Sequence, residues 1–383
     1  MSRNYLMKIT KINTGRFWRF FFFLILFLVF SSCTIYRFPE FEGKKIQQFE
    51  MVELGGIKQG VLIRGDDKDN PVMLFLHGGP GYPLFPFAPM GETMNRMEKA
   101  FTMVYWEQRG TGKSLSRRLP PETMNVDQFV SDLKELVAYV QKTMGVEKVF
   151  IWAHSWGTNF GAIFAAQYPE MVHAYVSTGQ SVNPYRNERL AYEFVMEQAK
   201  AENNRRALRE MATIDTLEAN YRLEDALLVR KWVYRYGGIV KRGAEERFYV
   251  NFNDIFLILA APQYSVLERL NLILYPYFSA QRLWPDLKAI NLIKQASRIE
   301  VPVFFLVGKH DIIVSAKLAE EYFEALDAPA GKELIWFERS AHRPHKEERE
   351  KFLEVMKTHI LESVLPRKDD PEKKEARTRL TSE

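Results

Sequence analysis

Three short motifs in this chain of 383 residues carry residue types that could together perform nucleophilic catalysis. Ser155 stands in Ala-His-Ser-Trp-Gly, between an apolar run and a helical pattern, which predicts a sharp turn that exposes its hydroxyl. Asp311 closes a later apolar run, and His342 follows the last one. The order serine, acid, histidine predicts that Ser155 is the nucleophile, His342 its general base and Asp311 the acid that orients the imidazole.

Each of these assignments has a competing interpretation. His345 is the alternative base, and His342 could instead be a solvated loop histidine. Ser155 could instead be a chance helix N-cap serine, and an aspartate at the end of a strand, such as Asp311, is also a common helix cap. Ala153 stands two residues before the serine, where glycine is usual, so the predicted turn must accept one extra methyl group.

Acyl transfer also requires backbone N–H groups that stabilise a tetrahedral oxyanion. The amide of Trp156, directly after the predicted nucleophile, is one expected donor. The sequence His-Gly-Gly-Pro-Gly at 77–81 follows another apolar run and offers the second donor, the amide of Gly79, because Pro80 has no N–H. Gly78 in the same turn is expected to contact the substrate.

The elements that must position these residues follow from the hydrophobic pattern. Apolar runs without polar alternation predict parallel strands buried on both faces; they span 72–76, 101–106, 149–152, 174–176, 301–307 and 334–337. Helices are expected at 126–144, 158–168, 316–326 and 346–361. Functional groups of such sheets gather beyond the carboxyl ends of the strands, where every motif above is found.

The pattern divides the chain into five segments. Residues 33–180 and 299–365 are expected to form the two parts of the α/β core. Residues 181–298 interrupt the alternation and are expected to form a helical cap over the carboxyl edge of the sheet. Residues 366–383 are dominated by charge and are expected to be a disordered tail.

Residues 1–32 resemble an export signal. They carry five basic and no acidic residues, and these five charges account for the whole formal net charge of +5, so the rest of the chain gives no case for nucleic-acid binding. The eleven apolar residues Phe20–Phe30 would form a helix of about 16 Å, short of a bilayer core of about 30 Å. Ser31-Ser32-Cys33 follows, with the only cysteine of the chain. The segment thus resembles a bacterial lipoprotein signal peptide, which implies that Cys33 is lipidated and that the chain is exported to a bacterial cell envelope and anchored to a membrane; an uncleaved anchor is the alternative.

The motifs HGGPG, EQRGTGKS, AHSWG, GKHD and SAH occur in this order, and the chain therefore resembles the prolyl aminopeptidase (proline iminopeptidase) family of α/β-hydrolases. The likeness covers 50–180 and 299–362. It implies an α/β-hydrolase fold with a mostly parallel sheet, helices on both faces and an inserted helical cap. It also implies the triad and oxyanion hole above, and neither metal nor organic cofactor. Glu107 replaces the family's aspartate, and Arg109 is expected to be a structural ion-pairing residue.

Substrate specificity is less well defined by the sequence. Family members hold the substrate's amino group with cap glutamates, whereas the corresponding segment here, 229–236, is basic. Glu188 and Glu193 are the remaining candidates for this contact. The expected function is hydrolysis of a small amide, such as the N-terminal, proline-like residue of a short peptide. The alternatives are a carboxylester hydrolase with the same triad and a non-catalytic binding protein. Dehalogenase and epoxide-hydrolase chemistry requires an acidic nucleophile where Ser155 stands.

Overall fold

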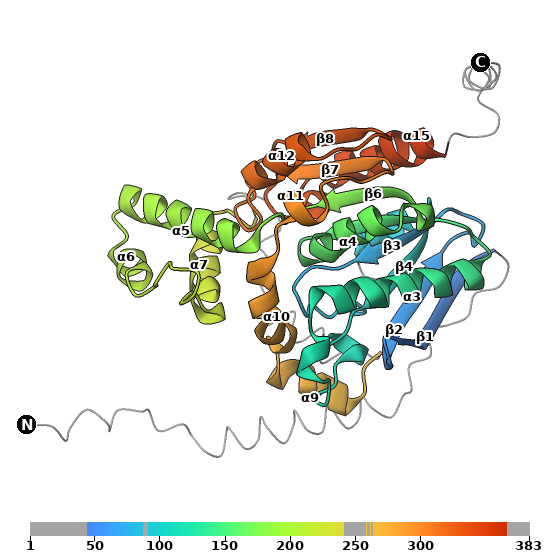
Figure 1. The fold of residues 1–383 in the computed structure, drawn as a ribbon, viewed down its shortest axis with the longest axis horizontal. Coiled ribbons are helices and arrows are strands. Elements are labelled where there is room, and N and C mark those ends of the chain that lie inside the picture. Colours follow the sequence, from blue (N-terminus) through green and yellow to red (C-terminus); the bar gives the residue numbers. More distant parts are fainter. Residues whose placement is uncertain (1–43, 87–90, 241–257, 259–260, 262, 366–383) are drawn as a thin grey trace, which may run out of the picture.

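The computed structural model describes residues 44–86, 91–240, 258, 261 and 263–365 (Figure 1). The predicted signal segment 1–32, Cys33 and the charged tail 366–383 lie outside these residues. Among the helices of the described ranges, none combines the length and the apolar character that a bilayer crossing needs.

Within the described residues, an eight-stranded sheet has the order β1-β2-β4-β3-β5-β6-β7-β8. β1 and β2 form an antiparallel hairpin, β2 is antiparallel to β4, and the pairs from β4 to β8 are parallel. The strands are β1 Ile46–Leu54, β2 Ile57–Gly65, β3 Val72–Leu76, β4 Thr102–Glu107, β5 Val149–His154, β6 Val172–Thr178, β7 Val303–Gly308 and β8 Lys332–Phe337. The six predicted strands are thus β3 to β8, with small shifts at their ends.

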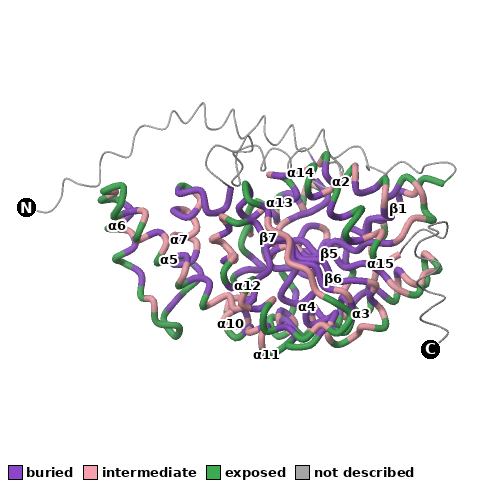
Figure 2. Tube along the Cα trace, turned by 90° about the horizontal axis from the view of Figure 1, so that it is seen from above, coloured by how far each residue is buried: buried purple, intermediate pink, exposed green. Residues whose placement is uncertain are grey.

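Burial explains why these runs are apolar throughout. Every residue of β3, β4 and β7 is buried, because helices cover both faces of the sheet. Figure 2 shows the buried strands between two helical layers, with α2 (Glu92–Met97) and α14 (Arg349–Glu354) on one side. On the other side lie α3 (Val126–Met144), α4 (Trp156–Gln167) and α12 (Ala316–Ala325).

The helix bounds follow local capping. The side chain of Asn125 accepts a hydrogen bond from the Gln128 amide at the start of α3, and Gly145, with φ 66°, ends that helix in the left-handed conformation. Short helical turns complete the core: η2 Gly112–Ser114, η3 Pro121–Thr123 and η4 Pro169–Met171.

The predicted final helix at 346–361 is wrong in one respect: it is interrupted. The chain forms α13 (Pro344–Glu347), α14, a π-helical stretch over Val355–Leu361 and α15 (Glu362–Val364). Glu348 leaves the helical conformation between α13 and α14, with φ −128° and ψ 56°. Its carboxylate there accepts hydrogen bonds from the Arg339 amide and the Ser340 hydroxyl, both at 2.8 Å.

The helices inserted between β6 and β7 form the cap predicted from the sequence. They are α5 Pro184–Ala201, α6 Arg205–Met211, α7 Leu223–Arg235, α9 Val266–Leu274, α10 Phe278–Ala289 and α11 Leu292–Gln295. In Figure 1, α5, α6 and α7 project away from the sheet as a separate group. This group has its own apolar cluster, with Val195, Met211, Trp232 and Val233 at its centre, and the buried cluster of the sheet is separate from it.

Candidate active site

Ser155 occupies the tight turn between β5 and α4 that its motif predicts. Its backbone has φ 54° and ψ −121°, a conformation that residues other than glycine rarely adopt and that is typical of functional sites. The Ser155 amide donates to Thr178 O at the end of β6 (3.0 Å), which ties the turn to the neighbouring strand. A Cβ atom on Gly157 would lie 2.3 Å from Leu76 O, so only glycine fits at that position of the motif.

The turn accommodates alanine in place of the usual glycine at position 153. Ala153 is fully buried and pairs with Leu76 and Ser177 in the sheet. A Cβ atom on Gly161 would lie 3.2 Å from the Ala153 methyl group, so the glycine on α4 provides the room that the methyl needs.

Asp311 and His342 meet at the carboxyl ends of β7 and β8. His342 Nδ1 lies 2.8 Å from Asp311 Oδ2, and both side chains are buried. The other carboxylate oxygen accepts the Val314 amide (3.1 Å), which fixes the orientation of the aspartate. With Nδ1–H donating to the carboxylate, His342 Nε2 is left as a proton acceptor. Gly308 permits this approach, since a Cβ atom there would lie 1.8 Å from Ala341 O.

The imidazole of His342 lies at the same rim of the sheet as Ser155. Its ring centroid is 4.9 Å from that of His154, the residue directly before the serine. A Cβ atom on Gly179 would lie 2.9 Å from His342 Nδ1, and Gly179 follows the residue whose carbonyl receives the Ser155 amide. Among the described residues, no hydrogen bond joins the Ser155 hydroxyl to His342. In enzymes without substrate such bonds are often long and shorten in the complex.

The glycine-rich turn after β3 lies against Ser155. A Cβ atom on Gly78 would lie 3.0 Å from Ser155 Cβ, so the backbone of the turn contacts the serine directly. The amides of Gly79 and Trp156 donate to no other group of the described ranges. Trp156 is also the first residue of α4, where the helix dipole favours negative charge. Both amides are thus free to bind an anion, as an oxyanion hole requires, and their assignment to the hole stays a prediction.

A hydrogen-bond network that the sequence did not reveal connects this turn to the serine turn. Gln108 Nε2 donates to His77 O (3.1 Å), and Gln108 Oε1 accepts the indole N–H of Trp156 (2.9 Å). His77 Nδ1 donates to Gly78 O (2.8 Å), and burial lowers the pKa of His77 to about 4, so the ring is neutral at pH 7. All three side chains are buried. The only available signal was the position of Gln108, in a Gly-rich loop directly after a strand.

Two buried charged side chains, Arg109 and Glu107, stabilise the loop that follows β4 and contains Gln108. Arg109 forms two 2.9 Å bonds to Asp132 of α3, through Nε and Nη2, and both side chains have 0% exposure. The structural role expected for Arg109 is therefore confirmed. The carboxylate of Glu107 accepts the amides of Leu84 and Lys113 and the hydroxyl of Tyr264, while burial raises its pKa. Glu107 thus holds the loop rather than facing the serine turn.

The alternative base, His345, has a different environment. Its ring packs against Trp152 and Phe352, and its Nδ1 is buried without a hydrogen-bond partner among the described residues. Burial lowers the pKa values of His345 and His154 well below their ordinary value, so both rings are neutral at pH 7. His342, rather than His345, contacts a carboxylate.

The cap glutamate proposed for substrate binding is already paired. Glu188 is buried on α5, where Oε1 accepts Arg230 Nη2 (2.6 Å) and Oε2 accepts the Tyr221 hydroxyl (3.3 Å). Lys231, also in the basic segment, binds Glu210 (2.5 Å). The basic segment is thus partly neutralised within the cap, and Glu188 contributes to that neutralisation.

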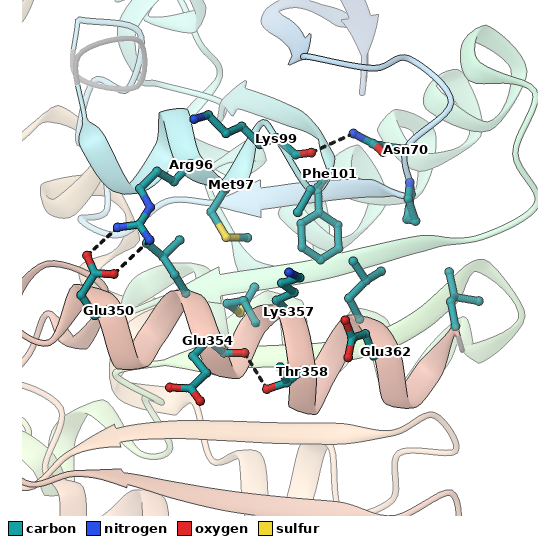
Figure 3. A pocket seen from close by; sticks show the side chains of 16 residues that line it. Asn70, Arg96, Met97, Lys99, Phe101, Glu350, Glu354, Lys357, Thr358 and Glu362 are labelled. Carbon is teal, nitrogen blue, oxygen red and sulfur yellow. Dashed lines mark hydrogen bonds and ion pairs between the residues drawn. The ribbon is translucent and has the colours of Figure 1, made fainter. Parts of the chain in front are cut away.

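Two further features bear on the binding of a cofactor or metal. Within the described ranges, no group of three or more His, Cys, Asp or Glu side chains is arranged to hold a metal ion. A pocket of about 830 Å³, shown in Figure 3, lies between the chain before β3 and β4 and the C-terminal helices. Its lining includes Asn70, Arg96, Phe101 and Lys357, at the opposite end of the strands from Ser155.

Sequence comparisons identify relatives over most of the chain. The profile of a family described as the alpha/beta hydrolase fold matches residues 71–347. A probable aminopeptidase, YbaC, of Bacillus subtilis is 30% identical over 319 residues, which cover 83% of this chain and 98% of the relative. A proline iminopeptidase of Saccharolobus solfataricus is 25% identical over 306 residues, which cover 78% of this chain and 86% of the relative.

Solved structures share the architecture. Proline iminopeptidase of Mycobacterium smegmatis superposes with a TM-score of 0.57 at 16% identity, covering 84% of this chain and 99% of that chain. An epoxide hydrolase of Bacillus megaterium superposes with a TM-score of 0.51 at 17% identity, covering 82% and 99%. At such identities the likeness shows the fold alone.

Proposed function

Because this chain belongs to the α/β-hydrolase family, we propose that it is a serine hydrolase with Ser155 as nucleophile, His342 as base and Asp311 as orienting acid. The observation that carries the proposal is the 2.8 Å contact between His342 Nδ1 and Asp311 Oδ2, beside a serine held at positive φ. These are the geometric requirements of a nucleophile turn and an oriented base.

In the proposed reaction, His342 Nε2 takes the hydroxyl proton as Ser155 Oγ attacks the substrate carbonyl. The oxyanion is bound by the Gly79 and Trp156 amides, and the imidazolium is stabilised by the Asp311 carboxylate. His342 then gives its proton to the leaving amine or alcohol, which leaves an acyl group on Ser155. Water, deprotonated by the same imidazole, hydrolyses the acyl-enzyme and restores the serine.

The proposed substrate is a small amide, such as the N-terminal, proline-like residue of a short peptide. This assignment is supported by the names of the relatives, a probable aminopeptidase and a proline iminopeptidase. One observation favours a carboxylester substrate instead. Glu188, the cap glutamate expected to bind a free amino group, is engaged by Arg230 and Tyr221.

A fluorophosphonate probe tests the serine nucleophile. Labelling is expected on the wild-type chain and is expected to be lost in Ser155→Ala with unchanged circular dichroism. A folded wild-type chain that does not react would instead favour a binding protein on the hydrolase fold.

Aminoacyl arylamides and short acyl esters then separate the two substrate classes. A peptidase should cleave proline arylamide and lose that activity when the amine is acetylated. A preference for butyryl esters over aminoacyl amides would contradict the peptidase assignment and favour the esterase.

We also propose that the chain is exported and anchored through a lipid on Cys33, on the basis of the basic and apolar pattern before it. Labelled palmitate should be incorporated in the bacterial host and should be lost in Cys33→Ser. Incorporation that persists in this variant would contradict lipidation at Cys33.

A further inference from the structure

Large apolar side chains are exposed at one place on the described surface far more than elsewhere. Six such side chains are exposed in the described ranges, and five of them lie on α9 or in the turn that follows it: Leu267, Leu270, Ile273, Leu274 and Tyr277. We call these five residues the α9 patch. The sixth, Leu217, lies before α7 in the cap. Scattered apolar side chains are ordinary on a protein surface, whereas a contiguous group marks an interaction site.

The patch belongs to a firmly held helix. α9 begins with a capping box, in which the Ser265 side chain accepts the Glu268 amide and the Glu268 side chain accepts the Ser265 amide. Glu268 also pairs with Lys113 (3.1 Å), and the inward residues Arg269 and Leu272 are buried. The helix therefore turns one side into the protein and presents an apolar face outward, rather than being a poorly packed segment.

We propose that the α9 patch lies in the interface of an anionic lipid bilayer. An amphipathic helix with leucines on its outer face inserts shallowly among lipid head groups, and nearby cations add attraction to anionic lipids. Arg117 and Arg118 are both exposed, and Arg117 lies beside the patch, because its Nη1 contacts the hydroxyl of Tyr275 (2.6 Å), in the same turn as Tyr277. Tyrosine is enriched at such interfaces because its ring is apolar and its hydroxyl polar.

The N-terminal sequence supplies a second, independent argument for this occupant. The apolar run Phe20–Phe30 and Cys33 predict that the chain is held at a membrane. Eleven residue steps separate Cys33 from Lys44, the first described residue, and they span at most about 40 Å. A domain tethered this closely meets the bilayer repeatedly. A second contact such as the α9 patch would fix the orientation of the tethered domain on the bilayer.

An environment-sensitive dye on the full-length chain tests this proposal. The label is attached in Leu267→Cys, and Leu217→Cys is the matched control, because the two leucines are similarly exposed (73% and 66%). Both variants carry Cys33→Ser, so that the introduced cysteine is the only thiol, and both keep the apolar run Phe20–Phe30, which we expect to bind vesicles. The vesicles contain phosphatidylglycerol and phosphatidylcholine, with pure phosphatidylcholine for comparison.

With anionic vesicles, we expect the emission of the label at position 267 to shift to the blue and its quenching by iodide to fall at least threefold. The control label should change little, and the effect at 267 should weaken on pure phosphatidylcholine and in Arg117→Glu/Arg118→Glu. Equal iodide quenching at both positions would overturn the proposal. So would a shift at 267 that depends on protein concentration without vesicles, which would identify a second copy of the chain as the occupant. Fluorophosphonate labelling of the same samples reports on Ser155 separately, so either proposal can fail alone.

Discussion

The contact between Asp311 and His342 leads to a sharp prediction for Asp311→Asn. Asp311 uses one oxygen for the Val314 amide and the other for His342 Nδ1–H. An asparagine has the same shape and keeps the first contact with its carbonyl oxygen. Its NH₂ group then faces Nδ1, so the imidazole must accept there and carry its proton on Nε2, where it cannot take the proton of Ser155.

The expected effect is a loss of about 10⁴-fold in kcat, which corresponds to about 5 kcal/mol of activation free energy. The assay is the rate constant for fluorophosphonate labelling, together with kcat on the best substrate of the panel. Asp286→Asn is the matched control, because Asp286 accepts the Val126 amide (2.9 Å) at the start of α3, away from the serine. The control should react within about twofold of wild type. A wild-type rate in folded Asp311→Asn would refute the proposed role of the aspartate.

Three further predictions concern the groups that support the site. Arg109→Met should lower the free energy of urea unfolding by about 3–5 kcal/mol, because it leaves the buried carboxylate of Asp132 without its cation. The control is Arg298→Met, which should lower it by less than about 1 kcal/mol, because Arg298 and its acidic partners are exposed. Gln108→Met should slow fluorophosphonate labelling by about 10²-fold at unchanged circular dichroism, because it disconnects the two turns. Acid should destabilise the chain. The pKa of His77 is about 4 in the folded chain and 6.5 when unfolded, so between these pH values the unfolded state binds more protons. The free energy of unfolding should therefore fall by about 3 kcal/mol as the pH falls from 6.5 to 4. His345→Phe should reduce the acid loss, measured as the difference in urea midpoint between pH 7.5 and 5.

Each of these has a clear contrary result. Equal destabilisation by the two arginine variants would mean that the buried pair contributes no more than a surface pair. A labelling rate near wild type in Gln108→Met would show that the network does not position the reacting groups. A urea midpoint independent of pH between 7.5 and 5 would contradict the neutral, buried histidines.

The sequence predicted those parts of the fold that depend on a local pattern. Buried parallel strands are recognisable because every position is apolar, and the serine turn is recognisable because Gly157 must approach Leu76 O. The break at Glu348 was missed, because a glutamate has good helix propensity and its partners, Arg339 and Ser340, lie in the preceding loop.

Contacts between distant segments also limit how much of the site can be predicted from the sequence. Gln108 bonds to His77 and to Trp156, about thirty and nearly fifty positions away in the chain, and nothing in its own neighbourhood indicates either partner. The pairing of Glu188 with Arg230 could not be predicted for the same reason, since the sequence of an amphipathic helix does not show whether a glutamate on it is buried or solvated.

The interrupted C-terminal helix supports the loop of His342 from a distance. The carboxylate of Glu347 accepts hydrogen bonds from the amides of Ala341 and Arg343, on either side of His342. The carboxylate of Glu348 accepts one from the Arg339 amide. Two consecutive carboxylates therefore hold the backbone of the loop that carries the imidazole. α14 is in turn fastened to α2 by the ion pair of Glu350 with Arg96. Changes in α13 or α14 would therefore act on the proposed reaction through the placement of one loop, leaving the reacting groups themselves unchanged.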